Sequence, residues 1–140
     1  MPANAIRTQG TSIEIEHSDT PGTFIKIGRC VSFDGPGGKA AIIDTTDLDS
    51  TAKEKLPGLP DEGSFSLVLN YNSKDNGQKE MQAARTAQAL RHFRVTFTDT
   101  GKAEFDAYVM EWKLSGRQDS KVEANATLEI TGAVTYTAAP

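Results

Sequence analysis

Four carboxylates stand in two stretches of alternating sequence, and paired carboxylates can act as a general acid and a general base. Glu104 and Asp106 alternate with apolar residues in the first stretch, and Glu123 and Glu129 do so in the second. A period of two residues is typical of a half-buried strand, so these acids are predicted to point away from the core. Acids on such a face of an antiparallel sheet are usually solvated, which favours a surface role over catalysis.

Two other motifs have the residue types of a ligand site without its spacing. Asp44, Asp47 and Asp49 resemble a calcium loop, but the glycine and the distal glutamate of an EF-hand are misplaced. The glycine-rich residues 35–38 lack the Gly-Lys-Ser/Thr ending of a P-loop, and a strand-like segment follows them. We predict no metal site, and a plain turn over residues 34–38.

The cysteine, histidine and arginine residues form no reactive group either. Cys30 has strand-like neighbours that suit a small buried side chain, and His92 lies near the end of a predicted helix, where it can act as a cap. One cysteine and two histidines exclude a disulfide within the chain and a Cys/His zinc cluster. Arg85, Arg91 and Arg94 lack the interleaved aromatic residues of a nucleic-acid platform. We predict no catalytic residue and no cofactor.

The composition is that of one soluble globular domain. The chain has 140 residues, 37% of them hydrophobic and 24% charged, which is enough to bury a core without metals or disulfides. Because no run could cross a bilayer and no signal-peptide pattern opens the chain, we expect a cytoplasmic product without a membrane partner. The net charge of -4 argues against a protein that clamps nucleic acid, but it suits a surface past which DNA slides.

Alternation dominates the chain and predicts a mainly β fold. Its longest pattern puts Ala124, Ala126, Leu128 and Ile130 on one face. Residues 75–92 are rich in good helix formers and contain no proline, so we predict one helix there. The predicted strands cover residues 11–16, 23–27, 30–34, 41–45, 64–71, 93–98, 104–110 and 122–131.

Residues 46–62 form the longest predicted connection between strands. They hold five acids and two lysines, a net charge of -3, together with spaced leucines and prolines. A connection of this length is uncommon in a compact domain unless it is functional or disordered. Leu48, Leu56 and Leu59 inside a charged rim are candidate anchors for a partner. We therefore predict a long loop that contacts another chain.

Several stretches are more specific in their combined order than any of them is alone. They are residues 32–38 (SFDGPGG), 43–46 (IDTT), 48–54 (LDSTAKE), 56–61 (LPGLPD), 69–71 (LNY), 77–78 (GQ) and 128–135 (LEITGAVT). This order resembles the lambda-like phage tail tube (major tail protein) family over about residues 22–135. The resemblance implies a non-enzymatic structural protein. Its implied fold is a β-sandwich or partly closed barrel with one flanking helix.

The resemblance also implies hexameric rings that stack into a hollow tube for DNA ejection, with the sheets of neighbours joined edge to edge. The pattern along the chain, without repeats or low-complexity tracts, predicts one domain at residues 11–136, between an N-terminal arm of residues 1–10 and a tail of residues 137–140. The implied partners are other copies of the chain and the tape measure, tail terminator and tail-tip proteins, while DNA passes without specific binding. The expected location is the virion tail, after assembly in the host cytoplasm.

In such a tube the loop of residues 46–62 would contact neighbouring subunits and rings, and acids on the lumen wall would repel DNA. The contact candidates are Asp47, Leu48, Asp49, Lys53, Glu54, Leu56 and Leu59, and the lumen candidates are Glu104, Asp106, Glu123 and Glu129. Alternation directs these acids away from the core but does not choose between lumen and exterior.

Two other interpretations stay open. A type VI secretion-like tube protein forms similar rings, although the run of residues 49–54 (DSTAKE) favours the phage family. A small-ligand-binding β-barrel would need an aromatic-lined pocket, which Trp112, Tyr71 and Tyr108 could supply.

Overall fold

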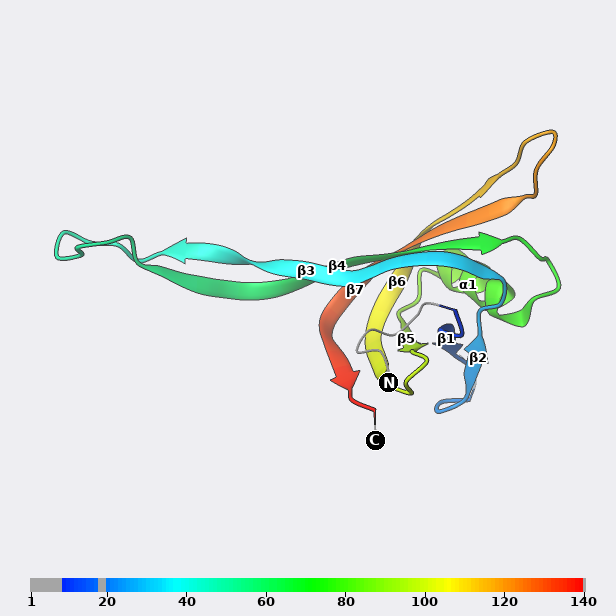
Figure 1. Ribbon diagram of the computed structural model, residues 1–140, viewed down its shortest axis with the longest axis horizontal. Coiled ribbons are helices and arrows are strands. Elements are labelled where there is room, and N and C mark those ends of the chain that lie inside the picture. Colours follow the sequence, from blue (N-terminus) through cyan, green and yellow to red (C-terminus); the bar gives the residue numbers. More distant parts are fainter. Residues whose placement is uncertain (1–8, 18–19, 140) are drawn as a thin grey trace, which may run out of the picture.

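The computed structural model describes residues 9–17 and 20–139, and within them it has seven strands and one helix (Figure 1). They follow in the order β1 (Ser12–Glu16), β2 (Phe24–Lys26), β3 (Cys30–Asp44), β4 (Lys55–Asn70), α1 (Asn76–Ala87), β5 (Arg91–Thr96), β6 (Lys102–Ser115) and β7 (Glu123–Thr137). The mainly β class with one helix is confirmed. Most of the expected N-terminal arm, and Pro140, lie outside the described residues. No helix in the described part is long and apolar enough to span a membrane.

The strands form one antiparallel sheet in the order β2-β1-β5-β6-β7-β4-β3, and this sheet bends over on itself at β6 and β7. These two strands pair with each other along their lengths. By contrast, β5 pairs with β6 only over Lys102–Ala107, and β4 pairs with β7 only over Glu123–Glu129. A register shift lies between Val109 and Glu111, beside the bend of β6. Strands that change layers through a bulge make the corner of a sandwich.

The bend divides the sheet into two layers. The long layer consists of β3, β4, Glu123–Glu129 of β7 and Tyr108–Ser115 of β6. The short layer consists of β2, β1, β5 and the remaining halves of β6 and β7. Strand periodicity decides which side chains fill the space between the layers, because alternate residues point to opposite faces.

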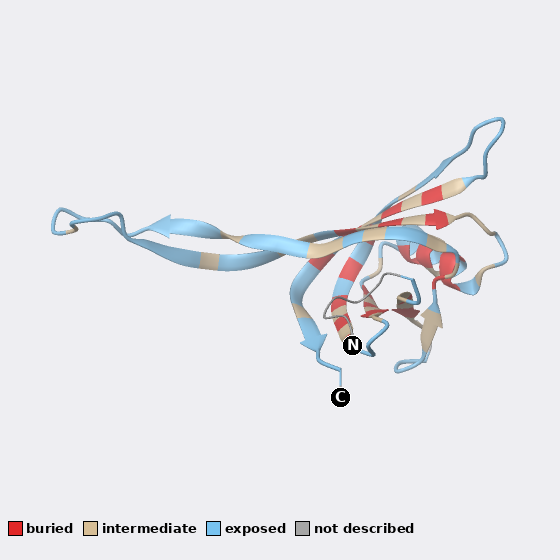
Figure 2. Ribbon diagram, in the orientation of Figure 1, coloured by how far each residue is buried: buried red, intermediate tan, exposed pale blue. Residues whose placement is uncertain are grey.

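Phenylalanine rings join the two layers through the core. Phe65 of β4 lies 5.4 Å from Phe105 of β6, and Phe33 and Phe93 extend the row at 5.9 Å on either side. Each ring pair of this kind stabilises the fold by about 0.5–1.5 kcal/mol beyond the stabilisation that comes from burying the rings. The alternate burial bands of the strands are visible in Figure 2. The expected β7 face of Ala124, Ala126, Leu128 and Ile130 is buried as predicted.

Helix α1 packs against β6, β1 and β2 through Gly77, Gln78, Met81 and Ala84. Asp75 caps its first turn, where the Gln78 amide donates to Asp75 Oδ2 at 3.0 Å. The prediction that this helix extends to about residue 92 was wrong. It ends at Ala87 because the next residue, Gln88, takes a left-handed conformation with φ 52°, and His92 belongs to β5.

The predicted turn at residues 34–38 was also wrong, because these residues lie inside the long strand β3. The glycines absorb register shifts opposite β4 instead of reversing the chain. A Cβ on Gly38 would overlap the carbonyl oxygen of Asp61, so glycine is required where the two strands approach each other most closely. The prediction of two separate strands at residues 30–34 and 41–45 was wrong for the same reason, because both segments belong to the single strand β3 (Cys30–Asp44).

The loop predicted over residues 46–62 is shorter in the structure. Residues 55–62 belong to β4, and only residues 45–54 connect the strands. We call residues 39–61 the arm, and residues 44–54 its tip. The arm projects far from the rest of the domain (Figure 1). Pro57 and Pro60 lie within the predicted loop, but each faces a residue of β3 in the ladder.

Replacement of Gly77 by alanine is predicted to destabilise the fold. Alanine in a helix is normally better than glycine by about 1 kcal/mol. Here its Cβ would overlap the backbone of Lys26 and Ile27, so overpacking at a cost of roughly 1–3 kcal/mol outweighs that gain. Urea unfolding would measure the change. Gly116→Ala is the control, because its Cβ meets Val122 at an ordinary 3.6 Å. Equal stability of both variants would contradict the tight contact.

Candidate functional site: an exposed arm and open sheet edges

The arm exposes apolar side chains along its whole length. Leu48 at its tip and Leu59 on its shaft have relative exposures of 104% and 90%, and Ile42, Ile43 and Leu56 are also exposed. A two-stranded hairpin has no second layer against which to bury such residues (Figure 2). Exposed apolar groups gathered on one element are typical of an interaction surface.

All seven contact candidates lie on the arm. Asp47, Leu48, Asp49, Lys53 and Glu54 are at the tip, and Leu56 and Leu59 are on the β4 side. The sequence interpretation missed Ile42 and Ile43, because an apolar strand pattern normally indicates a buried face.

Hydrogen bonds within the tip give it a definite shape. The Thr46 hydroxyl accepts from the Glu54 amide at 2.8 Å, and Ser50 donates to Glu54 Oε2 at 3.1 Å. The Asp49 amide donates to Asp47 Oδ1 at 3.0 Å. Hydrogen bonds from the Thr46 backbone and side chain hold the pKa of Asp44 below its usual value. The tip is therefore an ordered, negatively charged turn.

Several strand edges lack a partner among the described residues, and two of them lie at the two ends of the long layer. Strand β3 is hydrogen-bonded to β4 on one side and to no strand on the other. From Tyr108 onward, β6 pairs with β7 but no longer with β5, so its second edge is open there. Trp112, on this open part, has a buried Nε1 without a hydrogen-bond partner in the described residues. Open edges of this kind are templates for pairing with another chain.

The four candidate acids point away from the core, as alternation predicted, but they divide between the two layers. Glu129 and Glu123 lie in the half of β7 that pairs with β4. Glu104 and Asp106 lie in the half of β6 that pairs with β5, opposite Arg94 and His92. The fold therefore brings together only two of the four.

His92 joins Glu104 and Asp106 on the outer face of the short layer. Its Nδ1 lies 2.8 Å from Asp106 Oδ1, and its Nε2 lies 3.1 Å from Glu104 Oε1. Burial lowers the pKa of His92, but hydrogen bonds and charge from Asp106 and Glu104 outweigh burial and leave this pKa above its ordinary value. The sequence interpretation treated His92 as a helix cap and missed this cluster, because the pairs come from different strands.

A second ion pair extends the same face to β1. Arg94 Nε and Nη2 donate to the two carboxylate oxygens of Glu14 at 3.1 and 2.9 Å, and the guanidinium lies 3.9 Å from the centre of the Phe24 ring. Burial raises the pKa of Glu14, but the hydrogen bonds from Arg94 and Thr96 outweigh it and lower this pKa. These contacts tie β2, β1 and β5 together.

The remaining candidates form no reactive arrangement. Burial raises the pKa of the Cys30 thiol, which opposes formation of the nucleophilic thiolate. In the described part of the chain no group of three His, Cys, Asp or Glu residues could hold a metal ion. Tyr108 is exposed, whereas Trp112 packs against the core, so these aromatic residues do not line one pocket. The surfaces of the arm and the open edges are thus the main candidates for function.

Known proteins similar to this chain agree with one another. The family model described as "Phage tail tube, TTP, lambda-like" matches residues 4–104. The tail of an empty gene transfer agent (GTA) particle, of C6 symmetry, has a TM-score of 0.80 at 18% identity, over 96% of this chain and 100% of that chain. The SPP1 tail tube has a TM-score of 0.75 at 15% identity, over 95% and 79%. These similarities confirm the expected fold.

A third similar structure is the PVC sheath–tube complex of an extracellular contractile injection system in its extended state. Its TM-score is 0.74 at 13% identity, over 96% of this chain and 93% of that chain. No curated protein matches the chain.

Replacement of His92 by glutamine is predicted to remove a pH-dependent contribution to stability. Because the folded-state pKa of His92 is raised, its contribution is full below its unfolded pKa of about 6.5 and is lost as the pH rises through the folded pKa. The stability difference between wild type and His92→Gln should therefore shrink with rising pH. Urea unfolding at about pH 5.5 and 8.5 would measure it. A difference that stays constant would contradict the assignment.

Proposed function

Since the chain belongs to the lambda-like phage tail tube family, and is therefore a structural protein of the phage virion, we propose that its copies close into rings of six. The rings stack into a hollow tube through which DNA is ejected. The chain has no catalytic role and needs no cofactor in this function. The observation that carries the proposal is the pair of open edges, one at each end of the long layer.

Strand directions in the long layer suit closure into a ring. Its order is β6-β7-β4-β3 and every pair is antiparallel, so β6 and β3 at its two ends run in opposite directions. Copies related by rotation would bring β3 of one subunit beside β6 of the next. Because the number of strands is even, this junction is antiparallel like all the others. The sheet would then have no edge left around the ring.

The short layer is less suited to the same closure. It has five strands in the order β2-β1-β5-β6-β7, so the two strands at its ends run in the same direction. One of these, β2, has only three residues. This difference supports the long layer as the wall that surrounds the lumen, with the short layer and α1 outside it.

The outer face of the long layer would then meet the DNA. It carries Glu123 and Glu129 of β7, and Ser64 and Ser66 of β4 oppose Glu129 and Thr127. The two carboxylates repel the phosphate backbone, and the absence of an arginine or lysine cluster among the described residues of this face leaves DNA without a binding site. We retain Glu123 and Glu129 as lumen residues. In this arrangement Glu104 and Asp106 lie on the opposite side of the subunit, where both are within hydrogen-bonding distance of His92.

The arm would contact neighbouring subunits and the next ring. Its exposed leucines and isoleucines are the anchors, and the charged residues of the tip form the rim. The tape measure, tail terminator and tail-tip proteins are the further partners of such a tube, which is assembled in the host cytoplasm and is located in the virion tail.

Proline in the open half of β6 is predicted to stop ring formation. Amides of neighbouring residues alternate between the two edges of a strand, so one of Lys113→Pro and Leu114→Pro blocks the open edge and spares the β7 ladder. That variant should keep a thermal transition close to that of the wild type and form no rings in negative-stain microscopy. The wild type should form rings or tubes. A persistent wild-type monomer, or rings from both proline variants, would refute the proposal.

Cysteine labelling of assembled tubes is predicted to separate lumen from exterior. In a Cys30→Ser background, Glu129→Cys should react with a small maleimide and be protected from one attached to a large polymer. Glu104→Cys, a matched replacement on the short layer, should react with both. The reagent sizes matter because only the small one can diffuse along a narrow lumen. Equal labelling of both cysteines by the large reagent would remove Glu129 from the wall.

A further inference from the structure

We infer that the acidic tip of the arm docks onto the basic end of a copy in the next ring, at a surface formed by Arg29, Lys74 and Lys79. This inference rests on the proposed stacking of rings and names the acceptor of the arm. The acceptor surface, called here the basic end, belongs to the loop before β3, the loop before α1 and the first turns of α1.

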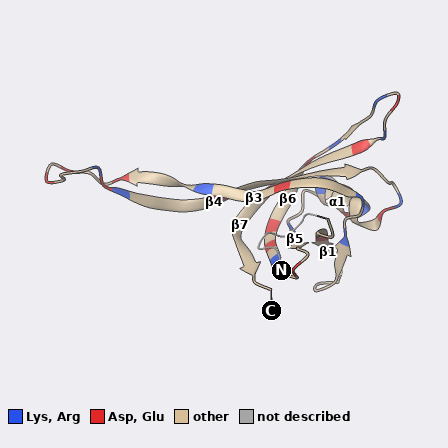
Figure 3. Ribbon diagram, in the orientation of Figure 1, with Lys and Arg blue, Asp and Glu red and all other residues tan. Residues whose placement is uncertain are grey.

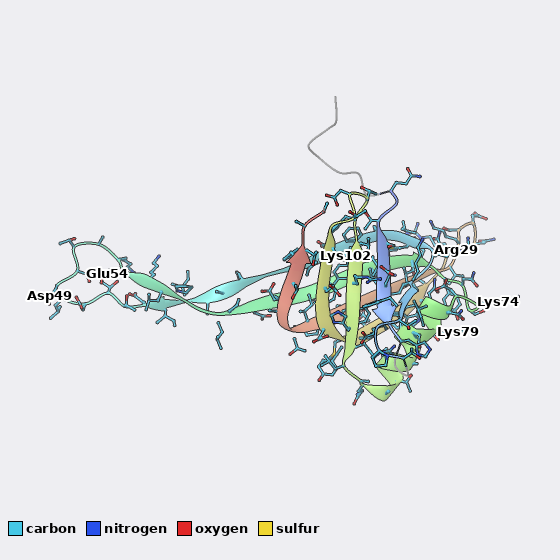
Figure 4. All side chains as sticks on the ribbon, turned by 90° about the horizontal axis from the view of Figure 1, so that it is seen from below. Arg29, Asp49, Glu54, Lys74, Lys79 and Lys102 are labelled. Carbon is cyan, nitrogen blue, oxygen red and sulfur yellow. The ribbon has the colours of Figure 1, made fainter. Side chains whose placement is uncertain are left out.

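The two surfaces lie at opposite ends of the molecule. Figure 4 shows Asp49 and Glu54 at the far end of the arm, and Arg29, Lys74 and Lys79 at the other end of the long axis. A contact that repeats along a tube is heterologous, so it joins two different surfaces of the same chain. Stacking in the direction of the arm brings the tip of one copy toward the basic end of the next.

The tip carries a net negative charge that the two lysines near it, Lys53 and Lys55, balance only in part. Residues 44–54 include Asp44, Asp47, Asp49 and Glu54 against the single cation of Lys53. None of the salt bridges among the described residues involves a residue of the tip. Leu48, fully exposed among these acids, adds an apolar group that has no contact to bury it.

The basic end has more cations than acids, and the acids beside it, Asp75 and Glu80, already have partners within the same chain. The carboxylate of Asp75 accepts from the amides of Gly28 at 3.1 Å and Gln78 at 3.0 Å. Glu80 lies 3.7 Å from Arg91 and 3.8 Å from His17. The exposed side chains of Arg29, Lys74 and Lys79 form none of the salt bridges of the described residues. They are therefore available to carboxylates of another chain.

Hydrogen bonds hold the two loops of the basic end in one arrangement. The buried side-chain amide of Gln78 donates through Nε2 to the carbonyl oxygens of Gly28 at 3.1 Å and Asn70 at 3.0 Å. Its Oε1 accepts from the backbone amide of Asn72 at 3.0 Å. Loops that are ordered before binding lose less entropy on docking. This network makes the basic end a rigid acceptor.

Arg29 has a backbone conformation that is costly for its residue type. Its φ of 65° lies in the left-handed region, which glycine adopts without strain but other residues adopt only at a cost. The Asn70 amide donates to the Arg29 carbonyl at 2.8 Å and helps to keep it there. Strained residues of this kind are concentrated at functional sites. At this position the residue is Arg29, whose guanidinium pairs with carboxylates in a fixed geometry.

A groove beside Lys79 suits the apolar part of the tip. Its lining consists of His17, Ile25, Asn76, Lys79, Glu80 and Ala83, between α1 and the strands β1 and β2. Ile25 and Ala83 are the apolar lining residues that could contact Leu48. Lys79 is the lining cation available to the acids that flank Leu48, whereas Glu80 of the same lining is paired with Arg91. Charge complementarity around an apolar anchor is the usual organisation of a specific interface.

Charge reversal with rescue tests this pairing. Lys74→Glu with Lys79→Glu should leave rings intact and raise the protein concentration needed for tubes by about tenfold or more, because like charges then face each other. Asp47→Lys with Asp49→Lys should do the same. The chain with all four replacements should regain tubes, since the attraction returns with opposite sign. Negative-stain microscopy and sedimentation would measure rings and tubes separately.

Lys102→Glu is the matched control, because it reverses one lysine on β6 away from both ends (Figure 4). It should form tubes like the wild type. Wild-type tubes from either double variant, or no rescue in the chain with four replacements, would overturn the inference while leaving ring formation untouched. A wild-type chain without rings would instead overturn the proposed function, and the inference with it.

Discussion

Everything else in the architecture depends on the exchange of partners along β6 and β7. A strand has only two edges, and these two strands use one edge for each other throughout. The other edge of β6 is shared with β5 for the first half alone, and the other edge of β7 is shared with β4 for its first half alone. One continuous sheet thereby becomes two layers with a common corner, and open edges are an unavoidable result.

The arm is the second consequence of this exchange. The part of β4 that precedes Ser64 has no β7 beside it, so β3 and β4 leave the domain there as a pair. Glycine at the closest approach of these strands lets the ladder continue through its register shifts. The pair has no second layer, and its apolar side chains stay exposed in the single subunit. Such a surface is reasonable in a family whose members work as assemblies, because other copies supply what the subunit lacks.

The charged residues of the short layer differ from those at the two ends of the molecule. The outer face of the short layer pairs its charges internally, through Arg94 with Glu14 and His92 with two carboxylates. The tip of the arm has a net negative charge and the basic end has a net positive charge. Neither the tip acids nor Arg29, Lys74 and Lys79 form any of the salt bridges of the described residues (Figure 3 colours the charged residues). Internal pairing stabilises the subunit, whereas separated charges along the long axis can act only between subunits. The polarity of the molecule is therefore built along the direction in which it would stack.

The sequence by itself determined the fold class and the alternating core face of β7, and it placed the proposed contact residues on one charged, leucine-bearing segment. These features are local, because periodicity and composition depend on residues a few positions apart. Only the tertiary structure decided that residues 34–38 continue a strand, since glycine permits a turn and a close crossing equally well. It alone joined His92 to Glu104 and Asp106, and separated these acids from Glu123 and Glu129, because strand pairing and bending bring together residues that no sequence spacing connects.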